Sequence, residues 1–239
     1  MDLDSFYSQE VIELWQKVLG PKMHYHFGIQ SDRYDPFDQS IINLFPFIQT
    51  NSNVLDCGCG WGGPATLLQK ELNCHITGVT ISKSQFEYIR NFEVFHCDLH
   101  EYIPTKKYDT AIFVESYTHL DNSKKIFNNF DGKVNSIIIK DYLCEQYYFL
   151  NDWNMHLRTK EMYIDELESC GYSIKVFNEI KNFWQPSIDL WYNGLMKLHP
   201  MDIRGQLKGL FELCYKVKFM NYEIPELSQC EIYATRLTS

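Results

Sequence analysis

The fold of this chain is decided by residues 54–64, which read VLDCGCGWGGP. Two β-prone residues run into an acid, Asp56, and then into a glycine-dense turn, and Pro64 stands where the first turn of a helix would lie. Glycines have no Cβ atom, so the backbone can bend sharply and a ligand can approach it closely. The free N–H groups of the next helix favour a partly anionic group. The stretch therefore predicts a strand, a tight loop and a helix around a bulky cofactor.

Two classes of cofactor use such a loop. The spacing of Gly58, Gly60 and Gly63 fits the dinucleotide fingerprint, which also needs an acid at the end of the second strand. That position holds Thr80, so a nicotinamide cofactor is disfavoured. The run VLDCGCGWGG resembles the first motif of class I methyltransferases that use S-adenosylmethionine (SAM). This resemblance implies SAM as the cofactor, bound by the residues of the motif: Asp56, Gly58, Cys59 and Gly60.

Composition excludes several other classes. The formal net charge of −9 disfavours nucleic acid as the main partner, because phosphate binding needs a basic face. The sequence has neither an apolar run long enough to cross a bilayer nor a signal peptide, so we expect a cytoplasmic protein. Its 8 cysteines are scattered, which predicts free thiols in a reducing compartment. Cys57 and Cys59 lack a second ligand pair at zinc-like spacing, so no metal site is expected.

The periodicity of apolar residues predicts alternating strands and helices. We expect helices over 8–19, 36–48, 65–72, 83 onwards, 159–169 and, rich in aromatic residues, 184–215. The expected strands are 54–57, 75–81, 93–97, 108–114, 135–140, 172–177 and 229–236. This pattern predicts one Rossmann-like α/β sandwich with a mostly parallel sheet. The resemblance implies seven strands, the last of them antiparallel.

The same pattern divides the single domain into parts. Residues 1–50 form a helical lid, 51–182 the cofactor-binding core, 183–226 a helical cap inserted before the last strand, and 227–239 that strand. In the enzymes that the chain resembles, such an insertion walls the acceptor pocket; the alternative is that it only adds core. The chain ends soon after its last strand, so it could also be a domain of a larger protein.

A second motif narrows the resemblance. Residues 78–85, GVTISKSQ, resemble the second motif of the branch that contains cyclopropane-fatty-acid synthases and the tocopherol and terpene methyltransferases. In that branch Thr80, Ser82 and Gln85 would contact the ribose and methionine parts of SAM, and Ser82 is also a candidate helix N-cap. The resemblance places Asp98, after the third strand, where a carboxylate accepts a hydrogen bond from the adenine amino group.

The fourth expected strand delivers a carboxylate and an imidazole to the carboxyl edge of the sheet, where ligands bind in open α/β folds. The run VESYTHL, residues 114–120, resembles the corresponding element of tocopherol, terpene and sterol methyltransferases. His119 is the candidate base or orienting group, and Glu115 could contact the acceptor or the cofactor. In cyclopropane synthases a bicarbonate-holding Glu precedes this His; here the position is Thr118, which disfavours cyclopropanation.

Two further segments are assigned to the acceptor side. Residues 137–146, IIIKDYLCEQ, with 156–172, resemble amine N-methyltransferases such as those of phosphoethanolamine, so Asp141 could hold an amine; alternatively it pairs with a neighbouring Lys or Arg. In the segment 22–28, Tyr25 or His24 could close the pocket, or the rings could simply pack on the core.

These residues predict transfer of a methyl group from SAM to a small-molecule or natural-product acceptor. Two acids facing the pocket favour a cationic or amine acceptor, so N-methylation leads. The alternatives are O-methylation of a carboxylate or hydroxyl on a modified peptide or lipid, and C-methylation of an isoprenoid with Glu115 stabilising the carbocation. A non-catalytic SAM-binding domain is the alternative from another class. The candidate catalytic residues are His119, Glu115, Tyr25, His24 and Asp141.

Overall fold

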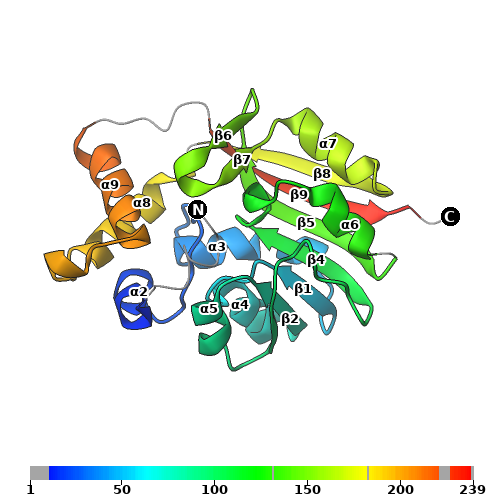
Figure 1. Ribbon diagram of the computed structural model, residues 1–239, viewed down its shortest axis with the longest axis horizontal. Coiled ribbons are helices and arrows are strands. Elements are labelled where there is room, and N and C mark those ends of the chain that lie inside the picture. The colour runs from blue at the N-terminus through cyan, green and yellow to red at the C-terminus, as the bar shows by residue number, and fades with distance from the viewer. Residues whose placement is uncertain (1–10, 131, 182, 221–226, 238–239) are drawn as a thin grey trace.

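The computed structural model describes residues 11–130, 132–181, 183–220 and 227–237. Its centre is one seven-stranded sheet in the order β3-β2-β1-β4-β5-β9-β8, shown in Figure 1. The strands are β1 Asn53–Cys57, β2 His75–Thr80, β3 Glu93–His96, β4 Tyr108–Val114, β5 Val134–Leu143, β8 Tyr172–Ile180 and β9 Ser228–Arg236. The first five pair in parallel, and β9 is antiparallel to both of its neighbours. This confirms the predicted Rossmann-like fold.

Helices cover both faces of the sheet. They are α3 Pro36–Ile42, α4 Gly63–Leu72, α5 Lys83–Tyr88, α6 Ser123–Phe130 and α7 Lys160–Glu168. Residues alternate along β4, so Ala111 and Phe113 belong to the core that α6 and α7 cover, whereas Ile112 belongs to the core under α3 and α4. This alternation makes two apolar layers, one on each face of the sheet.

A third apolar cluster lies beyond the carboxyl edge of the sheet. It joins α2 Ile12–Leu19, the lid loop 22–28, and the cap helices α8 Gln185–Leu195 and α9 Gln206–Phe219, which Figure 1 shows at one end of the molecule. The two helices α2 and α8 approach closely, because a Cβ on Gly194 would lie 2.5 Å from the Val18 carbonyl oxygen. The N-terminal helix and the late insertion therefore form one cap.

Several expected boundaries agree with the structure and others need correction. The strand at 108–114 is confirmed, and Ser82 and Thr159 cap α5 and α7 through their hydroxyls. The expected helix over 36–48 ends at Ile42 and a short 3₁₀ turn, η1 Phe45–Phe47, follows, since Pro46 cannot continue the helical hydrogen bonds. The predicted start of the first helix at Ser8 lies outside the described residues.

Two corrections concern the acceptor side. The expected helix over 184–215 is divided into α8, the 3₁₀ turn η4 Pro200–Asp202 and α9. The strand predicted to end at Lys140 continues to Leu143, because Asp141 and Tyr142 still pair with β9. Sequence reasoning missed a small hairpin, β6 Tyr148–Leu150 and β7 Met155–Leu157, joined by η3 Asn151–Trp153.

The cysteines and the helices of the described residues bear on what the composition predicted. All 8 cysteines are free thiols, and Cys57, Cys59, Cys74, Cys214 and Cys230 are buried. Among the described residues, no helix has the length and apolar character needed to cross a membrane.

Candidate active site

A cavity of about 1160 Å³ opens at the carboxyl edge of the sheet. Gly58 and Gly60 line one end of it, and His119 lies along its wall. Tyr25 from the lid loop and Trp191 from the cap also border it, and Tyr25 shares a small neighbouring recess with Gly58 and Gly60. One continuous space therefore joins the glycine loop to the cap.

The glycine loop has the shape of a cradle. Gly58 has φ +84°, and a Cβ there would lie 2.6 Å from the Cβ of Ser116. Gly60 has φ +52° and faces open space. The backbone N–H groups of Gly58 and Cys59 both donate to the Val79 carbonyl oxygen, at 2.9 and 3.0 Å, so the loop is fixed to the end of β2. Burial raises the pKa of the Cys59 thiol, which keeps it protonated.

Asp56, at the end of β1, is buried beside this loop. Its Oδ2 has no hydrogen-bond partner among the described residues, and burial raises the pKa of the carboxyl to about 7. Asp56 lines a small recess next to the main cavity together with Gly58, Cys59 and Gly60. A buried carboxyl oxygen without a donor fits a ligand that brings an N–H or ammonium group to the loop.

The second motif forms a compact hydrogen-bonded turn. The Thr80 hydroxyl donates to Gln85 Oε1 at 2.7 Å and accepts from the Ser82 N–H at 3.1 Å. Thr80 and Gln85 border the cavity, whereas Ser82 is fully buried and its hydroxyl accepts from the Gln85 N–H at 3.3 Å. Of the three predicted cofactor contacts, Ser82 therefore serves as the cap of α5. Asp98 also borders the cavity and accepts two hydrogen bonds from His100, each of 2.8 Å.

Glu115 is the most heavily bonded side chain of the site. Its Oε1 accepts from the Phe27 N–H and Lys140 Nζ, each at 2.7 Å, and from Gln229 Nε2 at 2.8 Å. Its Oε2 accepts from the Tyr142 hydroxyl at 2.8 Å. Glu115 borders the cavity, but protein donors already occupy both oxygens.

The same ion pair fixes the lid. Lys140, fully buried, donates to the Phe27 carbonyl oxygen at 2.9 Å, while Glu115 accepts from the Phe27 N–H. The Gly28 N–H donates to the Ser187 hydroxyl on α8 at 2.7 Å. Both polar backbone groups of Phe27 are thus clamped by β4 and β5, and the next residue is bonded to the cap.

Gly63, the third glycine of the spacing Gly58, Gly60 and Gly63, has a different role from the other two. A Cβ on Gly63 would lie 2.8 Å from His24 Nδ1 and from the Met23 carbonyl oxygen, and 2.9 Å from the Lys22 carbonyl oxygen. The space that the missing side chain leaves is therefore filled by the lid loop. Gly63 lets the lid lie directly on the start of α4.

Asp141 lies outside the predicted acceptor position. It is fully buried, and its oxygens accept from the Thr118 N–H at 3.0 Å and the Tyr142 N–H at 2.7 Å. Because β5 continues past Lys140, its alternation sends Lys140 and Tyr142 to Glu115 and Asp141 the other way. Burial raises the pKa of Asp141 to about 7, and the two N–H donors oppose this rise. The residue does not line the cavity but holds the turn η2 Tyr117–His119.

His119 stands at the cavity wall on η2. Its Nδ1 lies 3.1 Å from the carbonyl oxygen of Asn154 and donates to it, which leaves the lone pair of the neutral ring on Nε2. Burial lowers the pKa of His119, so the ring is neutral near pH 7. Asn154 follows η3 in the missed hairpin and has φ +48°, a left-handed conformation that asparagine tolerates. The hairpin thereby fixes the tautomer of the candidate base.

The lid contributes a different histidine from the one predicted. Tyr25 borders the cavity as expected, with its ring 4.7 Å from that of Trp15. His24 does not border it: its Nε2 lies 3.0 Å from Asp38 Oδ1 and its Nδ1 lies 3.0 Å from His26 Nε2. His26 lines the cavity instead, and burial lowers its pKa. His26 therefore lies between the cavity and His24, which it contacts through its Nε2.

The acceptor end of the cavity is largely built by residues that sequence reasoning did not single out. Hairpin and cap residues border it: Tyr147, Tyr148, Leu150, Trp153, Met155, Phe183, Trp191, Gln206, Gly209, Leu210 and Leu213. The cap and the hairpin touch, because a Cβ on Gly209 would lie 3.0 Å from the Trp153 ring. The only signal in the sequence was the density of aromatic residues in these segments.

Comparison with known proteins agrees with this geometry. Residues 54–132, from β1 to the end of α6, match the family model described as a methyltransferase domain. Residues of this chain are 31% identical, over 136 positions, to the probable (S)-tetrahydroprotoberberine N-methyltransferase 2 of Papaver bracteatum. That match covers 51% of this chain and 38% of the relative, so the chain corresponds to well under half of the plant protein.

Solved structures of methyltransferase-domain proteins share the whole fold. A cyclopropane synthase of Mycobacterium tuberculosis superposes with a TM-score of 0.78 at 12% identity, covering 98% of this chain and 97% of that one. Coclaurine N-methyltransferase, solved with N-methylheliamine and S-adenosylhomocysteine (SAH), gives a TM-score of 0.75 at 18% identity, covering 97% of this chain and 84% of that one. The predicted class I methyltransferase fold is thereby confirmed.

Proposed function

We propose that the protein binds SAM and transfers its methyl group to the nitrogen of a small-molecule amine. The observation that carries this proposal is the continuous cavity, which the glycine cradle, a neutral histidine and aromatic rings of the lid and the cap border together. The similarity to plant N-methyltransferases supports nitrogen as the acceptor atom.

The residues at the cradle fit the cofactor. Asp56 offers a buried carboxyl oxygen without a donor, which suits an ammonium group, and Gly58 leaves no room for a side chain. Thr80 and Gln85 border the cavity with hydroxyl and amide groups, which suit a ribose. SAM, when bound, supplies an electrophilic methyl group; the chain's work is to hold the acceptor in line and to remove a proton.

His119 performs the proton transfer in this proposal. An amine acceptor arrives largely as an ammonium ion, which has no lone pair for attack. The neutral imidazole accepts one proton at Nε2, and the acceptor is left with a nucleophilic nitrogen. Aromatic rings such as those of Tyr25, Phe27 and Trp191 favour a cationic acceptor and its methylated product by cation–π attraction.

Glu115 and Asp141 act on the protein in this proposal rather than on the acceptor. Glu115 holds the lid through the Phe27 backbone, and Asp141 holds η2, which carries His119. O-methylation, on a short peptide or lipid, and C-methylation of an isoprenoid remain alternatives. C-methylation through a carbocation stabilised by Glu115 is the less favoured alternative, since Lys140 already neutralises that carboxylate. A cytoplasmic location remains a prediction.

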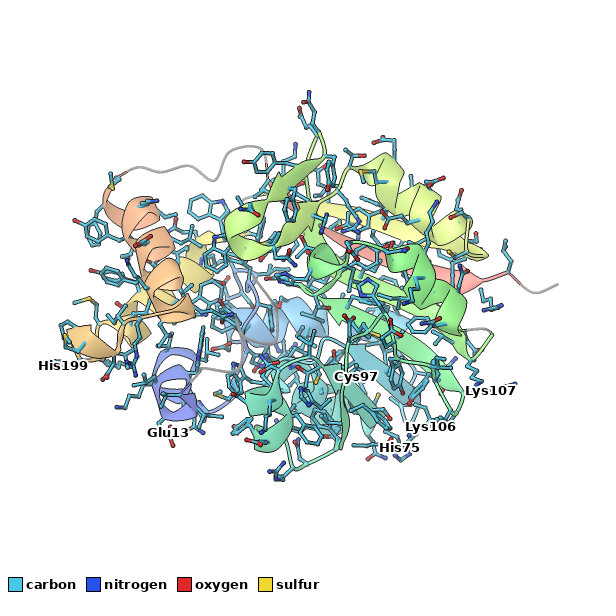
Figure 2. All side chains as sticks on the ribbon, viewed as in Figure 1. Glu13, His75, Cys97, Lys106, Lys107 and His199 are labelled. Carbon is cyan, nitrogen blue, oxygen red and sulfur yellow. The ribbon has the colours of Figure 1, made fainter. Side chains whose placement is uncertain are left out.

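The test is incubation of the protein with methyl-deuterated SAM and a panel of primary, secondary and tertiary amines, phenols and carboxylic acids, followed by mass spectrometry. We expect label in amines only. His119→Gln should lower the rate by about 10²- to 10⁴-fold, the usual range for loss of a general base. The matched control is His75→Gln, an exposed histidine at the start of β2, seen at the edge of the molecule in Figure 2.

Two results would overturn the proposal. Label in phenols or acids but not in amines would move the reaction to oxygen. Binding of SAH without transfer to any member of the panel would favour the alternative of a SAM-binding domain without catalysis.

A further inference from the structure

The cap holds a buried polar group for which the protein offers no partner. Gln206, the first residue of α9, is 7% exposed and borders the cavity. Its Oε1 is buried and accepts no hydrogen bond from any described residue. An unpaired buried acceptor costs about 1–3 kcal/mol, and folded proteins rarely leave one without reason. The side chain borders the large cavity, from which a donor could come.

Hydrogen-bond donors lie at the same end of the cavity. Helix α9 begins after Gly205, which has no side chain to cap it. The Lys208 N–H donates to the Gly205 carbonyl oxygen at 3.1 Å, but helix geometry provides no acceptor for the N–H groups of Gln206 and Leu207. Trp191 on α8 also borders the cavity, and its indole N–H has no partner in the described part of the chain. Two residues that border the cavity, Gln206 and Trp191, thus hold a buried acceptor and a buried donor without partners among the described residues.

This combination selects a particular chemical group. An ammonium could satisfy Gln206 Oε1 but would be repelled by the positive end of α9, and a carboxylate would suit α9 but offer no donor to the oxygen. A hydroxyl both donates and accepts, so it can satisfy the amide oxygen and one N–H together. Because Gln206 Oε1 is itself buried, binding of such a hydroxyl requires the amide to rotate about the last side-chain bond toward the cavity.

We propose that the cap end of the cavity is a hydroxyl-binding subsite, in which Gln206 at the start of α9 selects acceptors that carry a hydroxyl group away from the reacting nitrogen. This inference rests on the proposed amine methylation, and it specifies which amines the site would select. The polar end of the subsite lies on the cap, and the proton-accepting His119 lies on the core. The acceptor would therefore span both.

The experiment uses pairs of amines that differ only in a hydroxyl group. Tyramine and phenethylamine form one pair, and serotonin and tryptamine form a longer one. Calorimetry in the presence of SAH gives the dissociation constant of each, independently of methyl transfer. In at least one pair, the wild type should bind the hydroxylated amine about 3- to 10-fold more tightly, the ratio that corresponds to a single neutral hydrogen bond.

Variants of Gln206 make the test specific. Gln206→Met, which has a similar size but no hydrogen-bonding group, should bring this ratio close to 1 and leave the affinity for the amine without hydroxyl nearly unchanged. Gln206→Glu keeps an oxygen acceptor and should keep the preference. The control is Gln16→Met on the exposed face of α2, and circular dichroism verifies that each variant is folded.

The outcomes separate this inference from the proposed function. A wild type without preference in either pair, or a preference that persists in Gln206→Met, would overturn the subsite. If the preference is present and depends on Gln206 but no amine gains a methyl group, the subsite stands and the proposed reaction fails. If both members of each pair are methylated and bind with equal affinity, the proposed reaction stands and the subsite is refuted.

Discussion

The glycine loop and the segments that hold the lid and η2 use their carboxylates in opposite ways. At the glycine loop, Asp56 is buried with an oxygen for which the described residues provide no donor. At the lid, Glu115 accepts four hydrogen bonds from the protein, and Asp141 holds two backbone N–H groups. An acid that a motif places near a ligand therefore contacts that ligand only if its oxygens are still free. The hydrogen-bond donors that the protein places near each acid decide whether its carboxylate can bind a ligand or instead holds part of the protein in place.

The largest expected effect comes from breaking the buried ion pair. Lys140→Met leaves Glu115 as a buried charge without its cationic partner, and we expect the free energy of unfolding to fall by about 3–5 kcal/mol. Urea denaturation measures this change. The control is Lys106→Met, which breaks the half-exposed ion pair between Lys106 and Glu93; Figure 2 labels Lys106. This substitution should lower the free energy of unfolding by about 1 kcal/mol or less.

A second substitution sharpens this result. In Glu115→Gln/Lys140→Met the unpaired charge is gone, so part of the lost stability should return even though the lid keeps fewer hydrogen bonds. A double variant less stable than Lys140→Met alone would show that the carboxylate is worth more to the protein as a hydrogen-bond acceptor than it costs as a buried charge.

The next effect concerns the free carboxyl. Asp56→Asn should weaken SAH binding by about 10- to 100-fold, which corresponds to loss of a hydrogen bond to a charged group. Asp165→Asn, at an exposed position on α7, is the control and should leave the affinity unchanged. An unaltered affinity in Asp56→Asn would remove the distinction between the two kinds of carboxylate.

The pH dependence of binding tests the same carboxyl. Its pKa is raised to about 7 in the free protein, and an ammonium partner would lower it, so the complex holds fewer protons than the free protein. SAH affinity should therefore rise between about pH 5 and pH 7, with release of protons on binding. Calorimetry in buffers of different ionisation enthalpy measures that release, and Asp56→Asn should abolish it.

A smaller effect is expected where the lid meets the loop. Gly63→Ala would force the backbone of Lys22 and Met23 away from α4, at a cost of about 1–3 kcal/mol. Hydrogen exchange should then become faster across residues 22–28. Gly171→Ala, which has φ +82° but no neighbour within 4 Å of an added Cβ, should lose stability without changing exchange in the lid.

The smallest effect concerns the orientation of His119. Asn154→Val disfavours the left-handed backbone that points the Asn154 carbonyl oxygen at the ring, and Asn154→Gly retains it. We expect methyl transfer to fall by about 5- to 30-fold in the first variant and little in the second. In the wild type, activity should be lost as the pH falls through a pKa below the ordinary histidine value, because imidazolium cannot accept a proton. Equal rates in both variants would show that the hairpin does not position the base.

The cofactor half was predictable because its geometry is local. Residues 54–64 specify strand, loop and helix by glycine and proline alone, and Thr80, Ser82 and Gln85 form their turn within six consecutive residues. The end of the first helix and the caps at Ser82 and Thr159 follow from the same short-range chemistry. The residues that form these patterns are close neighbours in the sequence, so the sequence alone predicts them.

The acceptor half depends on contacts between distant segments. Glu115 meets Phe27 and Gln229, which lie 88 and 114 positions away, and no local pattern announces either partner. Asp141 lies away from the cavity wall because pairing with β9 prolongs β5, and alternation along that strand then puts Asp141 on the side opposite to Lys140 and Tyr142. The hairpin 148–157 was missed because its strands are only three residues long.

The hydrogen bonds that hold the lid at position 27 are made by the peptide groups of Phe27. Any residue with a backbone N–H could occupy position 27 and still be clamped by Glu115 and Lys140. The ring of Phe27, meanwhile, meets Tyr142, Phe183 and Trp191 at the cavity. Position 27 is therefore a place where evolution or a protein engineer can alter the range of accepted molecules while the closing of the lid stays the same.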